Sequence, residues 1–130
     1  MKKLLIIGCG GVASVAIHKC CQADVVFGDI MIASRTKPKC DALKAQLEGK
    51  TKTHISTAQV DADSVEQLCA LMQSYKPYAV LNVALPYQDL TIMDACLQCG
   101  AHYIDTANYE CENTDDPAWR AVYEKRCKEL

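Results

Sequence analysis

Three closely spaced glycines directly after the first apolar run are the feature that most constrains the fold. Residues 3–7 (KLLII) have the length and composition of a buried strand, and residues 8–13 (GCGGVA) follow them without a linker. Four residues of the next segment recur at helical spacing: Val12, Val15, Ala16 and Lys19. A strand, a glycine turn and a helix in this order open a βαβ unit.

Apolar runs and amphipathic stretches alternate along the rest of the chain. We expect strands at residues 3–7, 30–34, 54–60, 79–83 and 102–105. We expect helices at residues 10–21, 37–47, 65–75 and 89–99, and a last one from about residue 116 to the C-terminus. The alternation predicts an α/β fold: a Rossmann-like, doubly wound parallel sheet with strand order 3-2-1-4-5. Because the chain stops where such a fold adds its sixth strand, we expect residues 1–130 to be one domain, the N-terminal part of a longer protein.

Composition and charge argue against two classes of partner. The net charge is −2 and acidic and basic residues are interspersed, so neither nucleic acid nor a membrane surface is expected. The longest apolar runs, residues 4–7 and 79–81, are far shorter than a membrane span. Lys2 and Lys3 lead into glycines rather than into a signal-peptide core, so we expect a cytoplasmic protein.

The nine cysteines are interpreted as reduced thiols that serve as small hydrophobic residues. Cys96 and Cys99 have C-x-x-C spacing, but no second cysteine or histidine pair at metal-ligand spacing accompanies them, so no metal site is expected. The histidines fall within expected strands and helices and are assigned structural roles: His18, His54 and His102.

The glycine segment fits G-x-G-x-x-A, the pattern of a dinucleotide-binding turn. In that pattern Gly8 permits a tight turn, Gly10 lets the backbone approach a pyrophosphate, and Ala13 allows close packing of helix and strand. Gly11 and Val12 open the helix, whose N-terminal amides would face the phosphates. The alternative is a strand-to-helix turn that needs glycine only for its backbone angles.

The end of the second strand distinguishes NADP from NAD. An NAD-binding fold places a carboxylate there, but this chain has Ser34, Arg35 and Thr36 instead. A guanidinium and two hydroxyls suit a 2′-phosphate, so NADPH is the predicted cofactor. Asp29 precedes the strand and belongs to the opposite end of the sheet. The alternative is that Arg35 and Lys37 form an ordinary solvated start to a helix.

Three further loops contribute candidates at the same edge of the sheet. Asp61, after the third strand, could accept from the adenine amino group, although helix capping is an equal alternative. After the fourth strand, the small-residue loop could pass close to nicotinamide, or Pro86 could simply end the strand; this loop comprises Ala84, Leu85 and Pro86. Four polar or aromatic residues are candidates for substrate contact: Tyr87, Gln88, Asp105 and Tyr109. For Asp105 and Tyr109 the alternative is that they only form a turn. No catalytic residue is assigned.

Three stretches, IIGCGGVASV, IASRT and NVALPYQDLTIMDACLQCGAHYIDTANYE, together resemble the saccharopine dehydrogenase family, and more closely its carboxynorspermidine dehydrogenase branch. The resemblance implies an NADPH-binding Rossmann domain joined to a second domain that supplies most of the substrate site and the dimer contacts. It implies reduction of the imine formed from aspartate β-semialdehyde and a diamine. It also implies that Gly8–Ala13 hold the pyrophosphate, Ser34–Thr36 the 2′-phosphate, and Ala84–Pro86 the nicotinamide side, with Asp61 beside adenine.

Other functions remain open at this point. A related reductase could act on another substrate of the saccharopine dehydrogenase type. A nucleotide-sensing Rossmann module or a methyltransferase would share the glycine-rich first loop, but both normally carry an acidic residue after the second strand. Ser34, Arg35 and Thr36 argue against these two classes.

Overall fold

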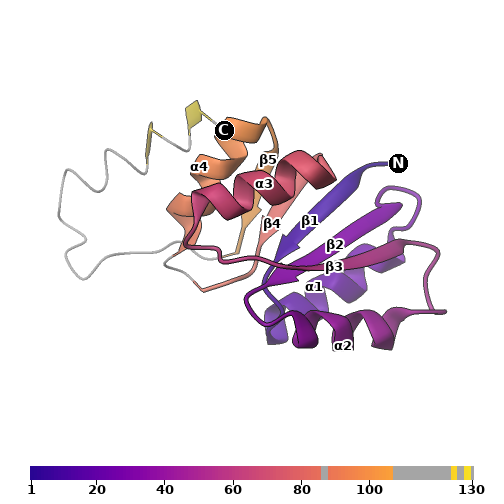
Figure 1. Cartoon of the computed structure of the whole chain (residues 1–130). Coiled ribbons are helices and arrows are strands. Elements are labelled where there is room, and N and C mark those ends of the chain that lie inside the picture. The colour runs from indigo at the N-terminus through magenta and orange to yellow at the C-terminus, as the bar shows by residue number, and fades with distance from the viewer. Residues whose placement is uncertain (86–87, 107–123, 126–127, 130) are drawn as a thin grey trace.

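The computed structural model describes residues 1–85, 88–106, 124–125 and 128–129 (Figure 1). Strands and helices alternate over this part of the chain, as predicted. In order they are β1 (Lys3–Ile7), α1 (Gly11–Gln22), β2 (Asp29–Ser34), α2 (Lys37–Leu47), β3 (His54–Gln59), α3 (Val65–Tyr75), β4 (Ala79–Asn82), α4 (Asp89–Cys99) and β5 (His102–Asp105). The helix expected from about residue 116 falls largely outside the described residues.

The five strands form one parallel sheet in the order β3-β2-β1-β4-β5, which confirms the predicted Rossmann-like topology. β1 lies in the middle, where Ile7 is paired with Ala33 of β2 on one side and with Asn82 of β4 on the other. Because all strands run in the same direction, their carboxyl ends meet at one edge of the sheet. The chain order reverses beside β1, which is where open sheets of this kind bind ligands.

Helices cover both faces of the sheet, with α1 and α2 on one side and α3 and α4 on the other (Figure 1). Successive side chains of β1 point to opposite faces, as the pleat requires. Leu4 and Ile6 pack in the core with α1 and α2, whereas Leu5 and Ile7 pack in the core with α3 and α4. A strand buried on both faces explains why KLLII shows a continuous apolar run rather than alternation.

The buried face of α1 differs from the one that its helical spacing suggested. Val12 and Val15 are 61% and 64% exposed, so they do not pack in the core. The residues that face the sheet are small or β-branched and recur every four positions: Ala13, Ile17 and Cys21. Helical periodicity predicted the helix correctly, but several small and apolar residues in succession left its inner face ambiguous.

Local residues determine where α3 begins and where α4 ends. Ser64 accepts a hydrogen bond from the Gln67 backbone N–H at 3.2 Å and so caps α3. Gly100 ends α4 in the left-handed region at φ +68°. No helix among the described residues has the length and apolarity that crossing a membrane requires.

Candidate functional site

A cleft of about 390 Å³ opens at the carboxyl edge of the sheet, within the size range of small-molecule sites. Its walls are the turns that follow β1, β2 and β4, together with the segment after β3. The lining residues are Ile7–Val12, Ser34–Thr36, Lys39, Val60, Ala62, Val83–Leu85 and Gln88. Most of the predicted cofactor-binding residues therefore surround one cavity.

Gly8 holds two parts of this cleft together. Its φ is +119°, a conformation that residues with a side chain rarely adopt. A Cβ added there would lie 2.7 Å from the Val83 carbonyl oxygen and 2.9 Å from the Ala84 nitrogen. The Gly8 N–H also donates to the Ala33 carbonyl at 2.9 Å. The tight turn is as predicted. The close approach of the β4–α4 loop is a second reason why only glycine fits at this position.

The two following glycines present bare backbone to the cleft. Gly10 is the N-cap of α1 and makes no side-chain cap, and a Cβ added to either Gly10 or Gly11 would meet nothing within 4 Å. The first turn of α1 contains no acidic side chain. A helix N-terminus carries free N–H groups and partial positive charge, so this wall suits an anion such as a phosphate.

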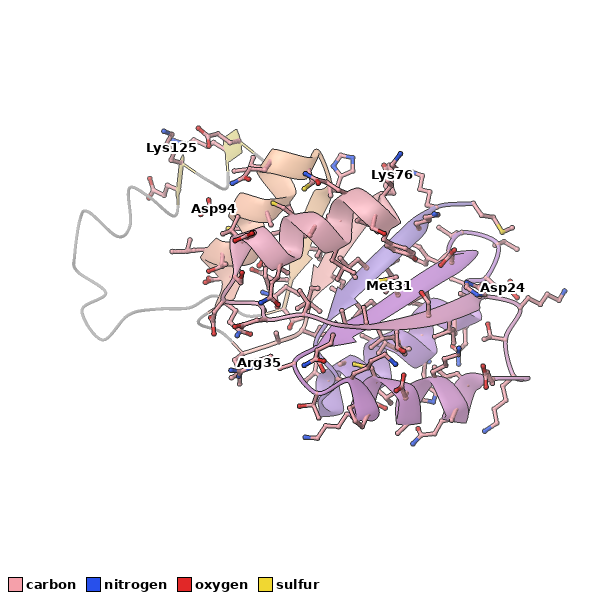
Figure 2. All side chains as sticks on the ribbon, in the orientation of Figure 1. Asp24, Met31, Arg35, Lys76, Asp94 and Lys125 are labelled. Atoms are coloured by element: carbon pink, nitrogen blue, oxygen red, sulfur yellow. The ribbon has the colours of Figure 1, made fainter. Side chains whose placement is uncertain are left out.

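Cationic side chains line the cleft beyond β2. Arg35 and Lys39 both border it, and neither forms an ion pair with any other described residue. Figure 2 shows Arg35 projecting from the turn between β2 and α2. Lys37 behaves differently, since its Nζ lies 3.0 Å from Asp41 on the exposed side of α2. Lys39 was not predicted from the sequence, although it lies only four residues after Arg35.

The Ser34 hydroxyl forms hydrogen bonds within the protein. Its Oγ accepts from the Thr36 backbone N–H at 3.0 Å and lies 3.2 Å from Cys9 Sγ and 3.3 Å from Cys40 Sγ. The hydroxyl thus fixes the turn that carries Arg35. Burial raises the pKa of the Cys40 thiol, partly offset by the hydrogen bond with Ser34.

Two aspartates lie away from the cleft. Asp29 is the first residue of β2 and accepts from the Tyr75 hydroxyl at 2.8 Å, at the opposite end of the sheet from Arg35, as expected. Asp61 does not line the cleft, although its neighbours Val60 and Ala62 do. Its Oδ1 accepts from the Asp63 N–H at 3.0 Å, so the carboxylate stabilises the turn before α3.

A buried polar bridge supports the wall formed by the β4–α4 loop. Asn82 is 4% exposed; its Oδ1 accepts from the Ala84 N–H at 3.0 Å and its Nδ2 donates to the Tyr103 hydroxyl at 3.0 Å. Tyr103 in turn donates to Asp105 Oδ2 at 2.9 Å. Burial raises the pKa of Tyr103, and Asp105 raises it further, so the phenol stays a neutral donor. Neither Asn82 nor Tyr103 was predicted from the sequence to act at this site.

We expect Asn82→Ala to lower the free energy of unfolding by about 1–3 kcal/mol, because the Ala84 N–H and the Tyr103 hydroxyl lose buried partners. Urea denaturation of the variant checks this. Tyr103→Phe is the matched control, since it removes only the half of the bridge that reaches β5. Equal stability of Asn82→Ala and the unmodified chain would show that the bridge does not hold the loop.

The candidates for substrate contact separate in the structure. Gln88 is 5% exposed, precedes α4 as its N-cap and borders the cleft. Asp105 ends β5 and is held by Tyr103 rather than lining the cleft. The remaining candidates lie outside the described residues: Pro86, Tyr87 and Tyr109. Their roles stay predictions.

Comparison with known families shows which family the sequence matches. Residues 4–128 match the family described as the saccharopine dehydrogenase NADP binding domain. The chain belongs to the saccharopine dehydrogenase family. Membership confirms the resemblance and the prediction of a nicotinamide cofactor. A solved relative of the fold, apo saccharopine dehydrogenase (L-Glu forming) from Saccharomyces cerevisiae, has a TM-score of 0.69 at 14% identity, covering 94% of this chain and 24% of that one.

Two curated family members are closer in sequence. Carboxyaminopropylagmatine dehydrogenase of Synechocystis is 44% identical over 131 residues, which cover 99% of this chain and 32% of the relative. Carboxynorspermidine synthase of Vibrio cholerae is 38% identical over 109 residues, which cover 80% of this chain and 26% of the relative. The chain thus spans about a third or less of the relatives it matches.

Proposed function

We propose that this chain is the NADP-binding part of an oxidoreductase that reduces a carbon–nitrogen double bond in polyamine biosynthesis. The observation that carries the proposal is the pairing of a bare glycine turn at the start of α1 with two cations, Arg35 and Lys39, that no described carboxylate neutralises. A dinucleotide with a 2′-phosphate needs both features: the glycine turn for its pyrophosphate and the cations for its 2′-phosphate.

The lining residues fit NADPH chemically. The backbone at Gly8, Gly10 and Gly11 and the first turn of α1 would hold the pyrophosphate. Arg35, Thr36 and Lys39 would hold the 2′-phosphate through charge-assisted hydrogen bonds. When bound, the nicotinamide supplies a hydride to an electrophilic carbon. The chain's own task is then to fix the cofactor and to keep the β4–α4 loop in place through Asn82.

The names of the relatives guide the choice of substrate. Carboxynorspermidine and carboxyaminopropylagmatine each combine a carboxylated aminopropyl unit with an amine. We infer that the electrophile is the imine formed from aspartate β-semialdehyde and an amine. The amine would be a diamine for the carboxynorspermidine product and agmatine for the carboxyaminopropylagmatine product. A second domain, outside this chain, would supply most of the substrate site and the contacts of a homodimer, as the share of the relatives that the chain covers suggests.

Calorimetric titration with NADPH and NADH tests the cofactor half of the proposal. We expect NADPH to bind at least about tenfold more tightly, the effect of one charge-assisted contact to the 2′-phosphate. Raising the salt concentration should narrow the gap, because exposed charge pairs are screened. Equal affinities for the two nucleotides would contradict the assignment of Arg35 and Lys39.

An assay of the full-length gene product tests the substrate half. With aspartate β-semialdehyde present, oxidation of NADPH is expected on addition of agmatine, diaminopropane or putrescine, and the relative kcat/KM values would rank these amines. Each amine without the semialdehyde is the control. No turnover with any of the amines would contradict the proposed substrate but not the proposed cofactor site. The substrate would then be another one of the saccharopine dehydrogenase type.

A further inference from the structure

A pair of thiols lies against the wall of the cofactor cleft. Cys9 stands between the glycines of the first turn, is half-buried and lines the cleft. Cys40, on α2, is fully buried. Their sulfurs lie 3.2 Å and 3.3 Å from the same atom, Oγ of Ser34, so residues 31 positions apart along the chain share one hydrogen-bonded cluster.

The hydrogen bonds of this cluster leave no spare donor on Ser34. Its Oγ already accepts from the Thr36 N–H, and its single hydroxyl proton can be donated to only one sulfur. The other sulfur must therefore donate its own proton to Ser34 or to its neighbour. Because both sulfurs lie within 3.3 Å of one oxygen, the two thiols are neighbours around Ser34. Burial raises the pKa of the Cys40 thiol, and the nearby Cys9 contributes to the rise. The pair is thus set up with one accessible and one enclosed member.

We propose that Cys9 and Cys40 form an oxidation site, converted to a disulfide by a hydroperoxide, and that the disulfide form binds the nicotinamide cofactor poorly. The inference rests on the proposed cofactor site. In the first step the Cys9 sulfur attacks a peroxide oxygen, the O–O bond breaks, and an alcohol or water leaves with the thiol proton, giving a sulfenic acid. In the second step the Cys40 sulfur displaces that hydroxyl, and water leaves as the S–S bond forms. Sulfur loses two electrons in total and the peroxide gains them.

The disulfide would disturb the parts of the cleft that hold phosphates. Bonding the sulfurs draws Cys9, and with it the glycine turn, toward α2. It also removes the thiol protons that Ser34 shares, and Ser34 fixes the Thr36 N–H in the turn bearing Arg35. Both the pyrophosphate wall and the 2′-phosphate wall therefore shift with one covalent bond. By linkage, a bound dinucleotide should protect Cys9 from oxidation.

Mass spectrometry and titration on the same samples test the proposal. Trypsin separates the two thiols, because peptide 4–19 contains Cys9 and peptide 40–44 contains Cys40, each without a second cysteine. After mild hydroperoxide treatment we expect these peptides to be linked, and NADPH affinity to fall by about tenfold or more, the loss of at least one charge-assisted contact. Dithiothreitol should restore the affinity, and NADPH present during oxidation should slow linkage.

Two variants sharpen the test. Cys40→Ser keeps a hydrogen-bonding group beside Ser34 but cannot form the bond, so peroxide should stop at the Cys9 sulfenic acid. Peptides 4–19 and 40–44 should stay unlinked, and NADPH affinity should fall less than in the unmodified protein. Cys20→Ser, on α1 and outside the cluster, should lose affinity on oxidation as the unmodified protein does.

The failures are distinguishable. Reduced protein that does not bind NADPH would contradict the proposed function. Reduced protein that binds NADPH, but forms no link between peptides 4–19 and 40–44 or keeps its affinity once linked, would overturn the oxidation site instead.

Discussion

Gly8→Ala is expected to lower the free energy of unfolding by about 3 kcal/mol or more and to abolish measurable NADPH binding. The positive φ alone costs a residue with a side chain on the order of 1–3 kcal/mol. The new methyl group would also overlap the backbone of Val83 and Ala84, which cannot give way as a flexible side chain can. Urea denaturation followed by circular dichroism measures the loss, and calorimetry measures the binding.

Gly11→Ala is the matched control for stability. Its Cβ would meet nothing within 4 Å, and Gly11 is the first residue of α1, where alanine is a better helix former by up to about 1 kcal/mol. We expect its free energy of unfolding to be unchanged or higher. If Gly8→Ala were as stable as Gly11→Ala, the close contact between the first turn and the β4–α4 loop would not contribute to the free energy of unfolding.

Arg35→Ala is expected to weaken NADPH binding by roughly ten- to hundredfold, the range of a lost charge-assisted hydrogen bond, while NADH affinity changes little. The reason is that Arg35 borders the cleft without a protein carboxylate to share its charge. Titration of both nucleotides against the same preparation gives the ratio directly. Arg35→Lys should recover part of the preference, because it restores the charge but not the planar fork.

Lys37→Ala provides the control for this second variant. It removes a cation only two residues away, but one already paired with Asp41 at 3.0 Å. NADPH affinity should stay close to that of the unmodified chain. A loss as large as that of Arg35→Ala would mean that the general positive charge of this turn, and not the Arg35 side chain, attracts the 2′-phosphate. Lys39→Ala should resemble Arg35→Ala in direction, since Lys39 also borders the cleft.

The order of the elements and the edge at which they meet could be predicted from the sequence because both follow from local patterns. Apolar runs and the glycine turn each act within a few residues, and parallel strands then bring their ends to one edge. The predicted bounds of α2 and α4 agree with the structure for the same reason. Those of β2 and β3 differ by a residue at one end, where pairing with a neighbour decides.

What the sequence could not show depends on contacts between distant segments. The overlap that excludes a side chain at Gly8 involves Val83, on another strand, and the bridge from Asn82 reaches Tyr103. Ser34 seemed free for a phosphate, but its hydroxyl meets thiols at residues 9 and 40. Lys39 and Lys37 look equivalent in sequence, and only the position of Asp41 separates them.

The contact between Gly8 and the backbone of residues 83 and 84 also has a consequence for biosynthesis. The first turn leaves the ribosome before β4 does, yet its final shape requires that later strand. Until that strand has emerged, the nascent chain has no finished cradle, so coenzyme cannot assist the folding of the earlier segments. Ligand rescue of unstable variants should therefore succeed for completed chains and fail for stalled ones that end before β4.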